Sequence, residues 1–372
     1  MTKNILITGG AGFIGAHAAR ELLAHGYSVR ALDSLVPQVH GPDRRRPAYL
    51  PSDVHLMVGD VRDSETAVRA LRGVDAVIHL AALVGVGQSM YRIAEYTRVN
   101  DEGTAVLLEA LSACPVEKLI VASSMSIYGE GAYIDEDGHT RQGYDRSLEQ
   151  LKREDWELRD SAGRPLIPVP TPESKAPSLA SVYALSKFDQ ERLCLMIGRA
   201  YGIPTVALRF FNTYGPDQAL SNPYTGVLSN FASRVLNGNP PLIFEDGLQK
   251  RDFVSVYDVA RACRLALESP SAAGNAINIS SGVPMSVREV AERTVRAIGA
   301  PGVEPRITGN YRAGDIRHCF ADVSLAKRLL GWEPVVTLEQ GLEDLAQWLA
   351  NQTAVDRGVE ARAELAARGL LV

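Results

Sequence analysis

The sequence predicts an α/β fold, a doubly wound parallel sheet followed by a smaller C-terminal α/β lobe. In the first half of the chain, short apolar runs alternate with segments of helical period, which indicates βαβ units and a parallel sheet covered on both faces. After residue 212, Gly and Pro become frequent and helices alternate with shorter strands. We therefore expect one domain over residues 1–212, with an irregular insertion at 130–178, a smaller lobe over 213–350 and a tail over 351–372.

The elements of the first domain are read from their period and length. Right-handed crossovers between consecutive strands make the doubly wound arrangement the expected one. The expected strands are Asn4–Thr8, Ser28–Asp33, Val54–Val58, Ala76–Leu80, Lys118–Ser123 and Pro204–Phe210, and the expected helices are Phe13–Ala24, Ser64–Leu71, Asn100–Leu111 and Val182–Tyr201.

The elements of the smaller lobe follow the same rules. Its helices are expected at Leu228–Leu236, Val256–Leu267, Val287–Ile298 and Leu338–Gln347, and its strands at Leu242–Phe244 and Ala276–Ile279. The tail is rich in Ala, Arg and Glu, so we expect a surface helix whose charges face solvent.

The composition narrows the class of protein. The 372 residues are 46% hydrophobic and 22% charged, as in ordinary globular chains. A net charge of −5 argues against a nucleic-acid binder that neutralises phosphates. No apolar run reaches about 18 residues, and a core strand follows Met1–Lys3 directly, so we expect no membrane span, no signal peptide and a cytoplasmic location. The cysteines are too far apart to suggest a disulfide framework or a zinc site: Cys114, Cys194, Cys263 and Cys319.

A glycine-rich turn follows the first strand and opens the first helix. Gly9, Gly12 and Gly15 would let the main chain approach a pyrophosphate, which the N–H groups of the helix N-terminus would bind. Asp33 ends the second strand, where a carboxylate binds ribose hydroxyls and repels a 2′-phosphate. The pattern predicts a Rossmann-like domain that prefers NAD to NADP. Residues 44–46 are arginines but lie well past Asp33, in a loop that we expect to face solvent or substrate.

Two further segments end strands of the predicted sheet. Asp60 follows the third strand, and both a contact with the adenine edge and an N-cap of the next helix fit its position. Ser123 and Ser124 end the fifth strand, and a hydroxyl there can share a hydrogen bond with a reacting sugar hydroxyl. The alternative for these serines is a cap of the main chain at the strand end.

Tyr183 and Lys187 lie four residues apart, which on a helix places them on one face. A tyrosine that acts as a base near pH 7 needs its pKa lowered by about three units, or roughly 4 kcal/mol. A neighbouring cation supplies ~1–3 units. Lys187 and the positive nicotinamide ring of NAD⁺ together would account for the shift.

The assembled motifs resemble those of the extended short-chain dehydrogenases/reductases of the NAD-dependent epimerase/dehydratase family, over residues 4–350. The segments that carry the resemblance are the glycine-rich turn, Asp33, 59–61, 79–82, Asn100, 123–129, Tyr183 with Lys187, 209–216, 250–254 and 312–315. The resemblance implies a nucleotide-diphosphate sugar as substrate, NAD as cofactor and no metal. It also implies a homodimer, for which we expect contacts through Asn100–Leu111 and Val182–Tyr201.

The resemblance also implies roles for single residues. Tyr183 would be the base, Lys187 its electrostatic partner and Ser124 the catalytic hydroxyl, while His79 is expected to be a satisfied core histidine. The residues expected to bind NAD are Gly9, Gly12, Phe13, Ile14, Gly15, Asp33, Asp60, Val61, Leu80, Ala81, Ala82, Asn100, Ser123, Tyr183, Lys187 and Phe210. Those expected to bind the substrate are Ser124, Met125, Ser126, Asn212, Leu228, Phe244, Arg251 and Arg312, of which Asn212 and the two arginines would hold the diphosphate.

Met125 and Ser126 discriminate between members of the family. Dehydratases carry an Asp–Glu pair directly after the catalytic hydroxyl, and the decarboxylases carry a Glu at the second position. Neither Met125 nor Ser126 can act as an acid or base, which argues against elimination of water. The resemblance then implies 4-epimerisation: Tyr183 takes the C4′ hydroxyl proton as hydride passes to NAD⁺, the 4-keto sugar turns about its link to the diphosphate, and hydride returns to the opposite face.

The insertion at 130–178 resembles one in dTDP-L-rhamnose 4-epimerase-like members of the family. A dTDP-6-deoxyhexose is therefore the expected substrate, and a UDP-hexose or UDP-uronate is the alternative. No cysteine lies between Cys114 and Cys194, so a metal-binding role for the insertion is not expected. The remaining alternatives are a 4-ketoreductase or dehydratase on the same fold, and a dinucleotide-binding protein without catalysis.

Overall fold

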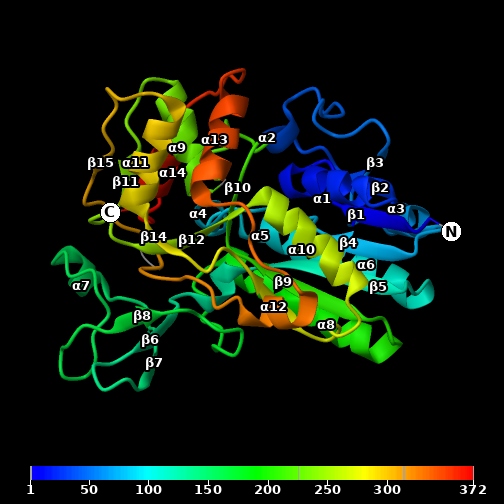
Figure 1. Cartoon of the computed structure of the whole chain (residues 1–372), viewed down its shortest axis with the longest axis horizontal. Helices are drawn as coiled ribbons and strands as arrows, with labels where there is room; N and C mark the ends of the chain where they lie inside the picture. The colour runs from blue at the N-terminus through cyan, green and yellow to red at the C-terminus, as the bar shows by residue number, and fades with distance from the viewer. Residues whose placement is uncertain (1, 225, 313–314, 372) are drawn as a thin grey trace.

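The computed structural model describes residues 2–224, 226–312 and 315–371. Its centre is a seven-stranded parallel sheet with the order β13-β9-β5-β4-β1-β2-β3 (Figure 1). Because all neighbouring strands are parallel, their carboxyl ends meet at one edge, where ligands bind in such folds. The strands are β1 (Asn4–Thr8), β2 (Ser28–Asp33), β3 (His55–Val58), β4 (Ala76–His79), β5 (Lys118–Ser124), β9 (Thr205–Phe210) and β13 (Ala276–Ile279). The predicted Rossmann-like fold is confirmed.

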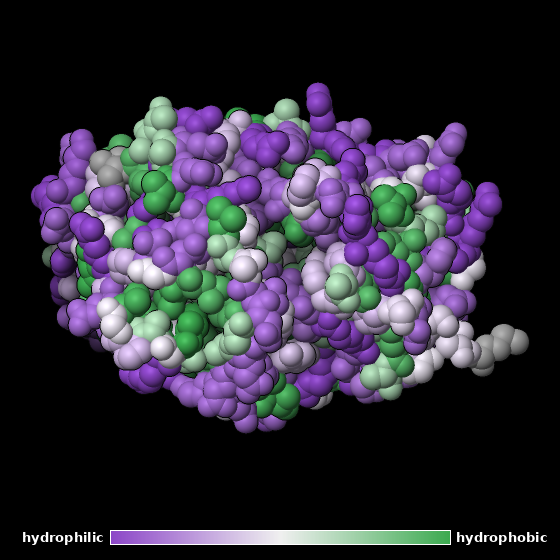
Figure 2. All heavy atoms as spheres, turned by 90° about the horizontal axis from the view of Figure 1, so that it is seen from above, coloured by the Kyte–Doolittle hydropathy of each residue, from purple (hydrophilic) through white to green (hydrophobic). Residues whose placement is uncertain are grey.

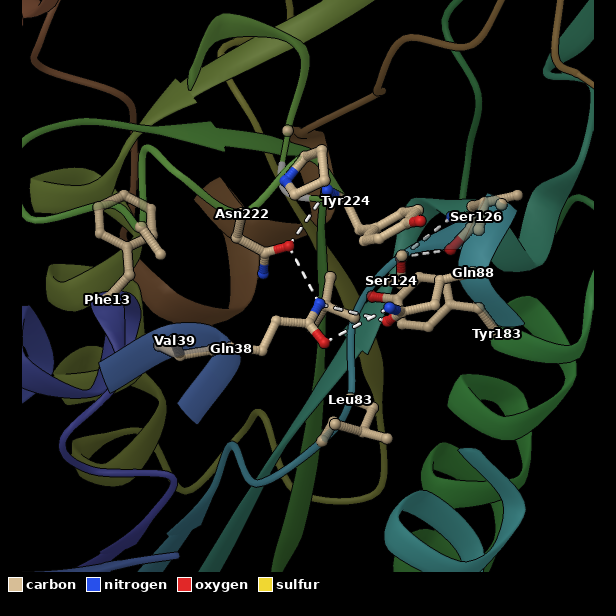
Figure 3. Close-up of a pocket in the computed structure, with 18 of the residues that line it drawn as sticks. Phe13, Gln38, Val39, Leu83, Gln88, Ser124, Ser126, Tyr183, Asn222 and Tyr224 are labelled. Carbon is tan, nitrogen blue, oxygen red and sulfur yellow. Dashed lines mark hydrogen bonds between the residues drawn. The ribbon is translucent and has the colours of Figure 1, made fainter. Parts of the chain in front are cut away.

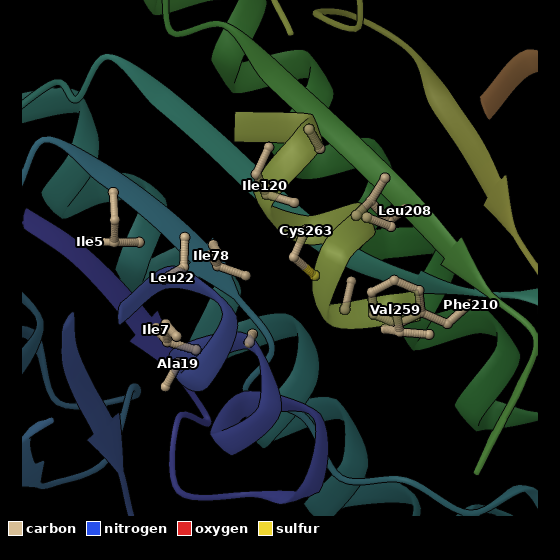
Figure 4. Packing of buried hydrophobic residues seen from close by; sticks show 14 of the residues in the cluster. Ile5, Ile7, Ala19, Leu22, Ile78, Ile120, Leu208, Phe210, Val259 and Cys263 are labelled. Carbon is tan, nitrogen blue, oxygen red and sulfur yellow. The ribbon is translucent and has the colours of Figure 1, made fainter. Parts of the chain in front are cut away.

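Helices cover both faces of the sheet, which explains why its strands are continuously apolar. Along β1, the side chains of Ile5 and Ile7 pack into one cluster and Leu6 packs into the other. Figure 4 shows the first cluster, in which Cys263 and Leu22 meet the strands from two different helices. The first face carries α1 (Phe13–Ala24), α10 (Val256–Glu268) and α12 (Ser324–Leu330), and the second carries α3 (Ser64–Leu71), α6 (Gly103–Ala113) and α8 (Val182–Tyr201).

One strand and one helix that were predicted for the smaller lobe belong to the first domain. The sequence pattern places Ala276–Ile279 and Val256–Leu267 in the smaller lobe, but β13 pairs with β9 in the central sheet and α10 packs on α1. A short apolar strand next to an amphipathic helix looks the same in either lobe. Its pairing partner, more than sixty residues away, is not visible in the local pattern.

The smaller lobe stands on the carboxyl edge of the sheet. Its core joins Tyr214, Leu228, Phe253 and Leu342. The strands form two small sheets, β10 (Asn212–Tyr214) with β12 (Lys250–Ser255) and β14 (Pro284–Ser286), and β11 (Leu242–Ile243) with β15 (Arg306–Ile307). Its helices are α9 (Val227–Leu236), α11 (Val287–Ile298) and α13 (Leu338–Leu349).

The insertion forms a separate small sheet that projects from the body (Figure 1). Its strands are β6 (Ala132–Ile134), β7 (Thr140–Gln142) and β8 (Ile167–Val169), with the short helix α7 (Leu148–Lys152). Buried charges attach it to the smaller lobe: Arg146 pairs with Glu245 at 2.7 Å, and both side chains are 2% exposed. Arg317, fully buried, pairs with Glu157 of the insertion at 2.6 Å and with Glu245 at 3.0 Å.

The tail contains the helix α14 (Gly358–Ala366), which packs against the body of the molecule. Ala361 and Leu365, one turn apart, are both buried, whereas Glu360 and Ala363 on other faces are exposed. The expectation of a surface helix with solvated charges is therefore correct for one face only. Short helices complete the chain: α2 (Pro37–His40), α4 (Val86–Ser89), α5 (Ile93–Tyr96), a π-helical turn at Thr97–Glu102 and a 3₁₀ turn at Met125–Tyr128.

From above, the surface is mainly hydrophilic, with smaller apolar patches between polar side chains (Figure 2). Within the described ranges, no helix has both the length and the apolar character needed to cross a membrane.

Candidate active site

A cavity of about 1060 Å³ runs along the carboxyl edge of the sheet and continues under the smaller lobe. The glycine-rich turn, the ends of β2, β4, β5 and β9, and the start of α8 contribute its first part. The 212–251 segment, Arg312 and α14 contribute the rest. The residues predicted to bind NAD and substrate lie along this cavity, with two exceptions, Asn100 and Leu228.

The glycine-rich turn has the geometry of a phosphate cradle. Gly9 has φ +70°, and a Cβ there would lie 2.9 Å from the Ala81 nitrogen. A Cβ on Gly15 would collide with the Gly9 carbonyl oxygen, whereas one on Gly12 would meet only that oxygen, at 3.3 Å. No side chain caps the N-terminus of α1. Its free N–H groups and the positive end of its dipole therefore face the cavity, and the turn fits the pyrophosphate of NAD.

Asp33 is held in a fixed orientation at the end of β2. Its two carboxylate oxygens accept hydrogen bonds from the main-chain nitrogens of Ala11, at 3.0 Å, and Leu35, at 2.9 Å. Arg44 donates to the carbonyls of Ser34 and Leu35, so it supports the Asp33 loop rather than the cavity. The carboxylate thus remains the charge that faces a bound ribose, as expected of an NAD site.

Asp60 does not cap a helix, so one of its two predicted roles is wrong. The N-cap of α3 is Asp63, whose side chain accepts a hydrogen bond from the Glu65 nitrogen. Asp60 pairs with Arg62 at 2.6 Å, and this hydrogen bond holds the pKa of the Asp60 carboxyl below its usual value. Asp60 lies on the cavity, which leaves the contact with adenine as its predicted role.

Tyr183 and Ser124 meet where β5 ends and α8 begins. Ser124 Oγ lies 2.5 Å from Ser126 Oγ and accepts a hydrogen bond from the Ser126 nitrogen at 3.2 Å. Figure 3 shows Ser124 between Ser126 and the phenol of Tyr183. Burial raises the pKa of Tyr183, and the hydrogen bond with Ser124 lowers it in part. The N-terminus of α8 is fixed by a hydrogen bond from the Tyr183 nitrogen to Ser89 Oγ at 3.0 Å.

Lys187 lies one turn after Tyr183, as predicted, but its ammonium group has a different partner. Lys187 Nζ donates to Gln190 Oε1 at 2.6 Å. Burial lowers the pKa of Lys187 to about 8. The lowering of the Tyr183 pKa by Lys187 and the nicotinamide ring together stays a prediction.

A buried ion pair joins β9 to α8 next to the cavity. Arg209 of β9 pairs with Glu191 of α8 at 2.6 Å, and Ser123 Oγ donates to the same carboxylate at 2.6 Å. Ser123 thus ties β5 to α8, and the capping alternative is wrong for Ser123. It is correct for Ser124, whose Oγ caps the 3₁₀ turn by accepting a hydrogen bond from the Ser126 nitrogen. His79 accepts and donates within a buried hydroxyl pair, 2.7 Å from Thr8 Oγ1 and 2.9 Å from Thr104 Oγ1, as expected of a satisfied core histidine.

Asn100 and Leu228 are the two predicted site residues that lie off the cavity. The Asn100 amide is fully buried and is used within the protein: it bonds the main chain of Leu83, at 2.7 and 3.1 Å, and Ser186 Oγ, at 2.9 Å. It therefore positions the cavity wall at Leu83 and the helix α8 at Ser186. Leu228 is 2% exposed in the core of the smaller lobe, because the face of α9 that meets the cavity begins one residue earlier, at Val227.

The predicted diphosphate-binding residues lie together on the substrate side. Arg251 donates to the carbonyls of Ile316 and Arg317, and Arg312 pairs with Asp315 at 3.0 Å while its guanidinium lies 5.0 Å from the centre of the Phe244 ring. Although burial opposes it, these cations hold the pKa of the Asp315 carboxyl below its usual value. Ala313 and Gly314, between them, lie outside the described residues.

Sequence reasoning missed a set of amide side chains on the cavity. Gln38 of α2 donates to Asn222 Oδ1 at 3.0 Å and to Gln88 Oε1 of α4 at 3.3 Å (Figure 3). These contacts join the dinucleotide side of the cavity to the loop that leads to the smaller lobe. Lone amides in two short helices and one loop form no motif, so no signal in the sequence predicts them.

Comparisons with known proteins agree with this geometry. The NAD-dependent epimerase/dehydratase family matches residues 5–154 and 160–280. The chain is 35% identical to the dTDP-L-rhamnose 4-epimerase of Burkholderia thailandensis over 354 residues, which cover 94% of this chain and 96% of that protein. The UDP-glucose 4-epimerase of Thermotoga maritima, solved with UDP-glucose, is 30% identical with a TM-score of 0.76, over 93% of this chain and 98% of that one. The UDP-glucose 4-epimerase of Thermus thermophilus, solved with NAD, is 30% identical with a TM-score of 0.73, over 94% and 100%.

Proposed function

The chain belongs to the NAD-dependent epimerase/dehydratase family, and we propose that it is a nucleotide-sugar 4-epimerase. The observation that carries the proposal is the constellation at the end of β5. A tyrosine and a serine lie next to each other beside a phosphate cradle (Figure 3), and the two residues that follow the serine, Met125 and Ser126, carry no carboxylate.

The side chains along the first part of the cavity fit NAD. Gly9, Gly12 and Gly15 with the start of α1 would hold the pyrophosphate, Asp33 the adenosine ribose, and Lys187 the nicotinamide ribose. When bound there, NAD supplies a hydride acceptor and then a hydride donor for C4′ of the sugar.

The chain's own residues would manage the proton and the orientation of the sugar. Tyr183 Oη would take the proton of the C4′ hydroxyl and give it back, with Ser124 Oγ sharing the hydrogen bond. Both residues lie at fixed element ends, because Ser124 ends β5 and the Tyr183 nitrogen is bound by Ser89. Arg251 and Arg312 would hold the diphosphate while the 4-keto sugar turns.

A dehydratase is the second candidate, and the cavity argues against it. Elimination needs a positioned carboxylate near the reacting carbon, and Met125 and Ser126, which line the cavity beside Ser124, offer none. For the substrate, we propose a dTDP-6-deoxyhexose. The insertion at 130–178 and the relative from Burkholderia thailandensis, named for dTDP-L-rhamnose, support this choice over a UDP-hexose or UDP-uronate.

We also propose a homodimer that pairs through α6 and α8. Leu185 and Met196 are 46% and 57% exposed and lie on one face of α8, which supports a contact between subunits there. Sedimentation equilibrium should give twice the chain mass, and Met196→Glu should shift it to the monomer.

The function is tested by incubating the purified protein with dTDP-L-rhamnose, UDP-glucose and UDP-glucuronate and following the C4′ configuration by NMR. We expect epimerisation of at least one sugar with no net consumption of NAD⁺ or NADH. Stoichiometric oxidation of NADH with a 4-keto sugar, or a lasting 4-keto product, would instead identify a ketoreductase or a dehydratase.

Tyr183→Phe should lower kcat by ~10²–10⁴-fold while NAD stays bound, since it removes only the hydroxyl that moves the proton. Tyr201→Phe is the matched control, because Tyr201 lies on the same helix and is exposed. Equal turnover of the two variants would remove Tyr183 from the mechanism.

A further inference from the structure

The C-terminal tail crosses from the smaller lobe to the first domain. On the lobe side, Asp356 pairs with Arg234 of α9 at 2.9 Å, with both side chains nearly buried, and the Val355 nitrogen donates to Ser221 Oγ at 3.0 Å. Asn237, which caps the C-terminus of α9, also donates to the Ala354 carbonyl at 2.9 Å. These contacts fix the segment that leads into α14.

The other end of the tail is tied to the first domain. Glu364 accepts hydrogen bonds from Tyr91 at 2.6 Å and Tyr224 at 2.7 Å. The guanidinium of Arg368 lies 4.3 Å from the centre of the Tyr91 ring. Leu365 packs so closely on Gly87 of α4 that a Cβ there would lie 3.3 Å from it. The helix α14 therefore spans both sides of the cavity.

The inner face of α14 forms part of the cavity wall. Ala361, Arg362 and Leu365 of α14 line the cavity, as does Leu370 after the helix, and Arg234 of α9 lines it beside the start of α14. The two guanidinium groups differ in their partners. Arg234 has the Asp356 carboxylate, whereas the only hydrogen bond of Arg362 within the described residues goes from Nε to the Gly358 carbonyl, at 3.2 Å. No carboxylate of the described ranges lies within ion-pair distance of Arg362.

This wall thus carries more positive than negative charge. Two cations and one carboxylate meet there, and Arg362 is only partly exposed. Burial and the charge of Arg234 lower the pKa of Arg362, so its charge is poorly compensated by the protein. Bringing an anion to such a cation recovers the charge-assisted hydrogen bonds that the protein leaves unmade.

We propose that α14 completes the substrate cavity and that Arg362 binds an anionic group of the nucleotide sugar. The inference deepens the proposed function and rests on it. The shared chemistry is a phosphate or carboxylate oxygen, and two sources supply it: the diphosphate that every candidate substrate carries, and the carboxylate that only a uronate carries.

The experiment is calorimetric titration of the full-length, NAD-loaded protein with dTDP, UDP and UDP-glucuronate. Arg362→Gln should weaken binding at least ~10-fold, the size expected when a hydrogen bond to a charged group is lost. A loss with all three compounds identifies the diphosphate as the partner of Arg362. A loss confined to UDP-glucuronate identifies the sugar carboxylate.

The matched control is Arg357→Gln, which makes the same charge change on an exposed residue of the tail and should bind all three compounds as the wild type does. Arg362→Lys, which keeps the charge, should recover part of the affinity. Thermal unfolding and bound NAD should match the wild type in each variant, which separates loss of binding from loss of fold.

Two results overturn different claims. Wild-type binding that Arg362→Gln leaves unchanged would overturn the role of Arg362 alone. A wild-type protein that binds none of the three compounds would overturn the proposed substrate class itself.

Discussion

The dinucleotide end of the cavity is built mainly from main chain, whereas the substrate end is built from side chains. At the first end, glycines and the N-terminus of α1 present N–H groups, and Asp33 supplies one charge. At the other end, arginines and an asparagine come from segments scattered between residues 212 and 362. The first surface suits one constant group, a pyrophosphate, and the second can change its specificity one side chain at a time.

The two ends also differ in how their charges are supported. Asp33 is oriented by main-chain nitrogens of its own neighbourhood, at 3.0 and 2.9 Å. Arg251 and Arg312 depend on the 315–317 segment, which in turn is held by buried charges of the insertion, since Arg146 donates to the Asp315 carbonyl at 3.0 Å. A substitution at the dinucleotide end should therefore affect only neighbouring residues. A substitution that disturbs the support of the substrate end should also affect more distant residues.

The largest effect is expected in the glycine turn. Gly15→Ala places a Cβ against the Gly9 carbonyl, so the turn must open and NAD binding should weaken at least ~100-fold, equivalent to about 3 kcal/mol. Gly12→Ala meets only one atom, at 3.3 Å, and should keep the fold and most of the NAD affinity. Bound NAD per chain, measured after gel filtration, distinguishes the two. Equal loss in both variants would show that close packing is not what selects these glycines.

The insertion gives the next effect. Arg146→Met leaves Glu245 buried with one cation fewer, which should cost about 3 kcal/mol of unfolding free energy in urea titrations and raise KM, because the 315–317 segment loosens. The control Arg159→Met breaks a more exposed pair with Asp155, which solvent screens, so it should lower the unfolding free energy far less than Arg146→Met does. If Arg146→Met leaves KM unaltered, the insertion does not support the substrate end.

A smaller effect is expected at Asp33. Asp33→Ser removes the charge that repels a 2′-phosphate, so the preference for NAD over NADP should fall about 10-fold in equilibrium binding, roughly 1.4 kcal/mol. Asp53→Ser, a substitution on the exposed surface, should not alter the preference. Continued exclusion of NADP by the Asp33 variant would assign the selectivity to another group.

The free energy of unfolding is expected to depend on pH through His17. His17 of α1 lies 3.1 Å from the Pro216 carbonyl, and burial lowers its pKa to about 4. The unfolded chain, with its ordinary value near 6.5, binds a proton first, so this contribution is complete above pH 6.5 and is lost as the pH falls towards 4. The contribution of His17 to the free energy of unfolding is on the order of 3 kcal/mol. His17→Gln should flatten the dependence of unfolding free energy on pH in that window, whereas the exposed His25→Gln should not.

The sequence predicts what is local. Strands such as Asn4–Thr8, the glycine turn, and the tyrosine and lysine one turn apart all depend on neighbours within a few residues, and the structure has them as predicted. The placement of β13 beside β9, the Gln38–Asn222 contact and the approach of Arg362 to the cavity join segments far apart in the chain. Asn100 shows a second limit, because a motif residue can lie near a site and yet serve only to position it.

The central claim is transient oxidation at C4′, with the same hydrogen returned to the same carbon. The direct measurement uses a nucleotide sugar that the protein turns over, labelled with deuterium at C4′, in ordinary water. The account predicts that NMR finds the deuterium still at C4′ of the epimerised product. A product that carries solvent hydrogen at C4′ would contradict it.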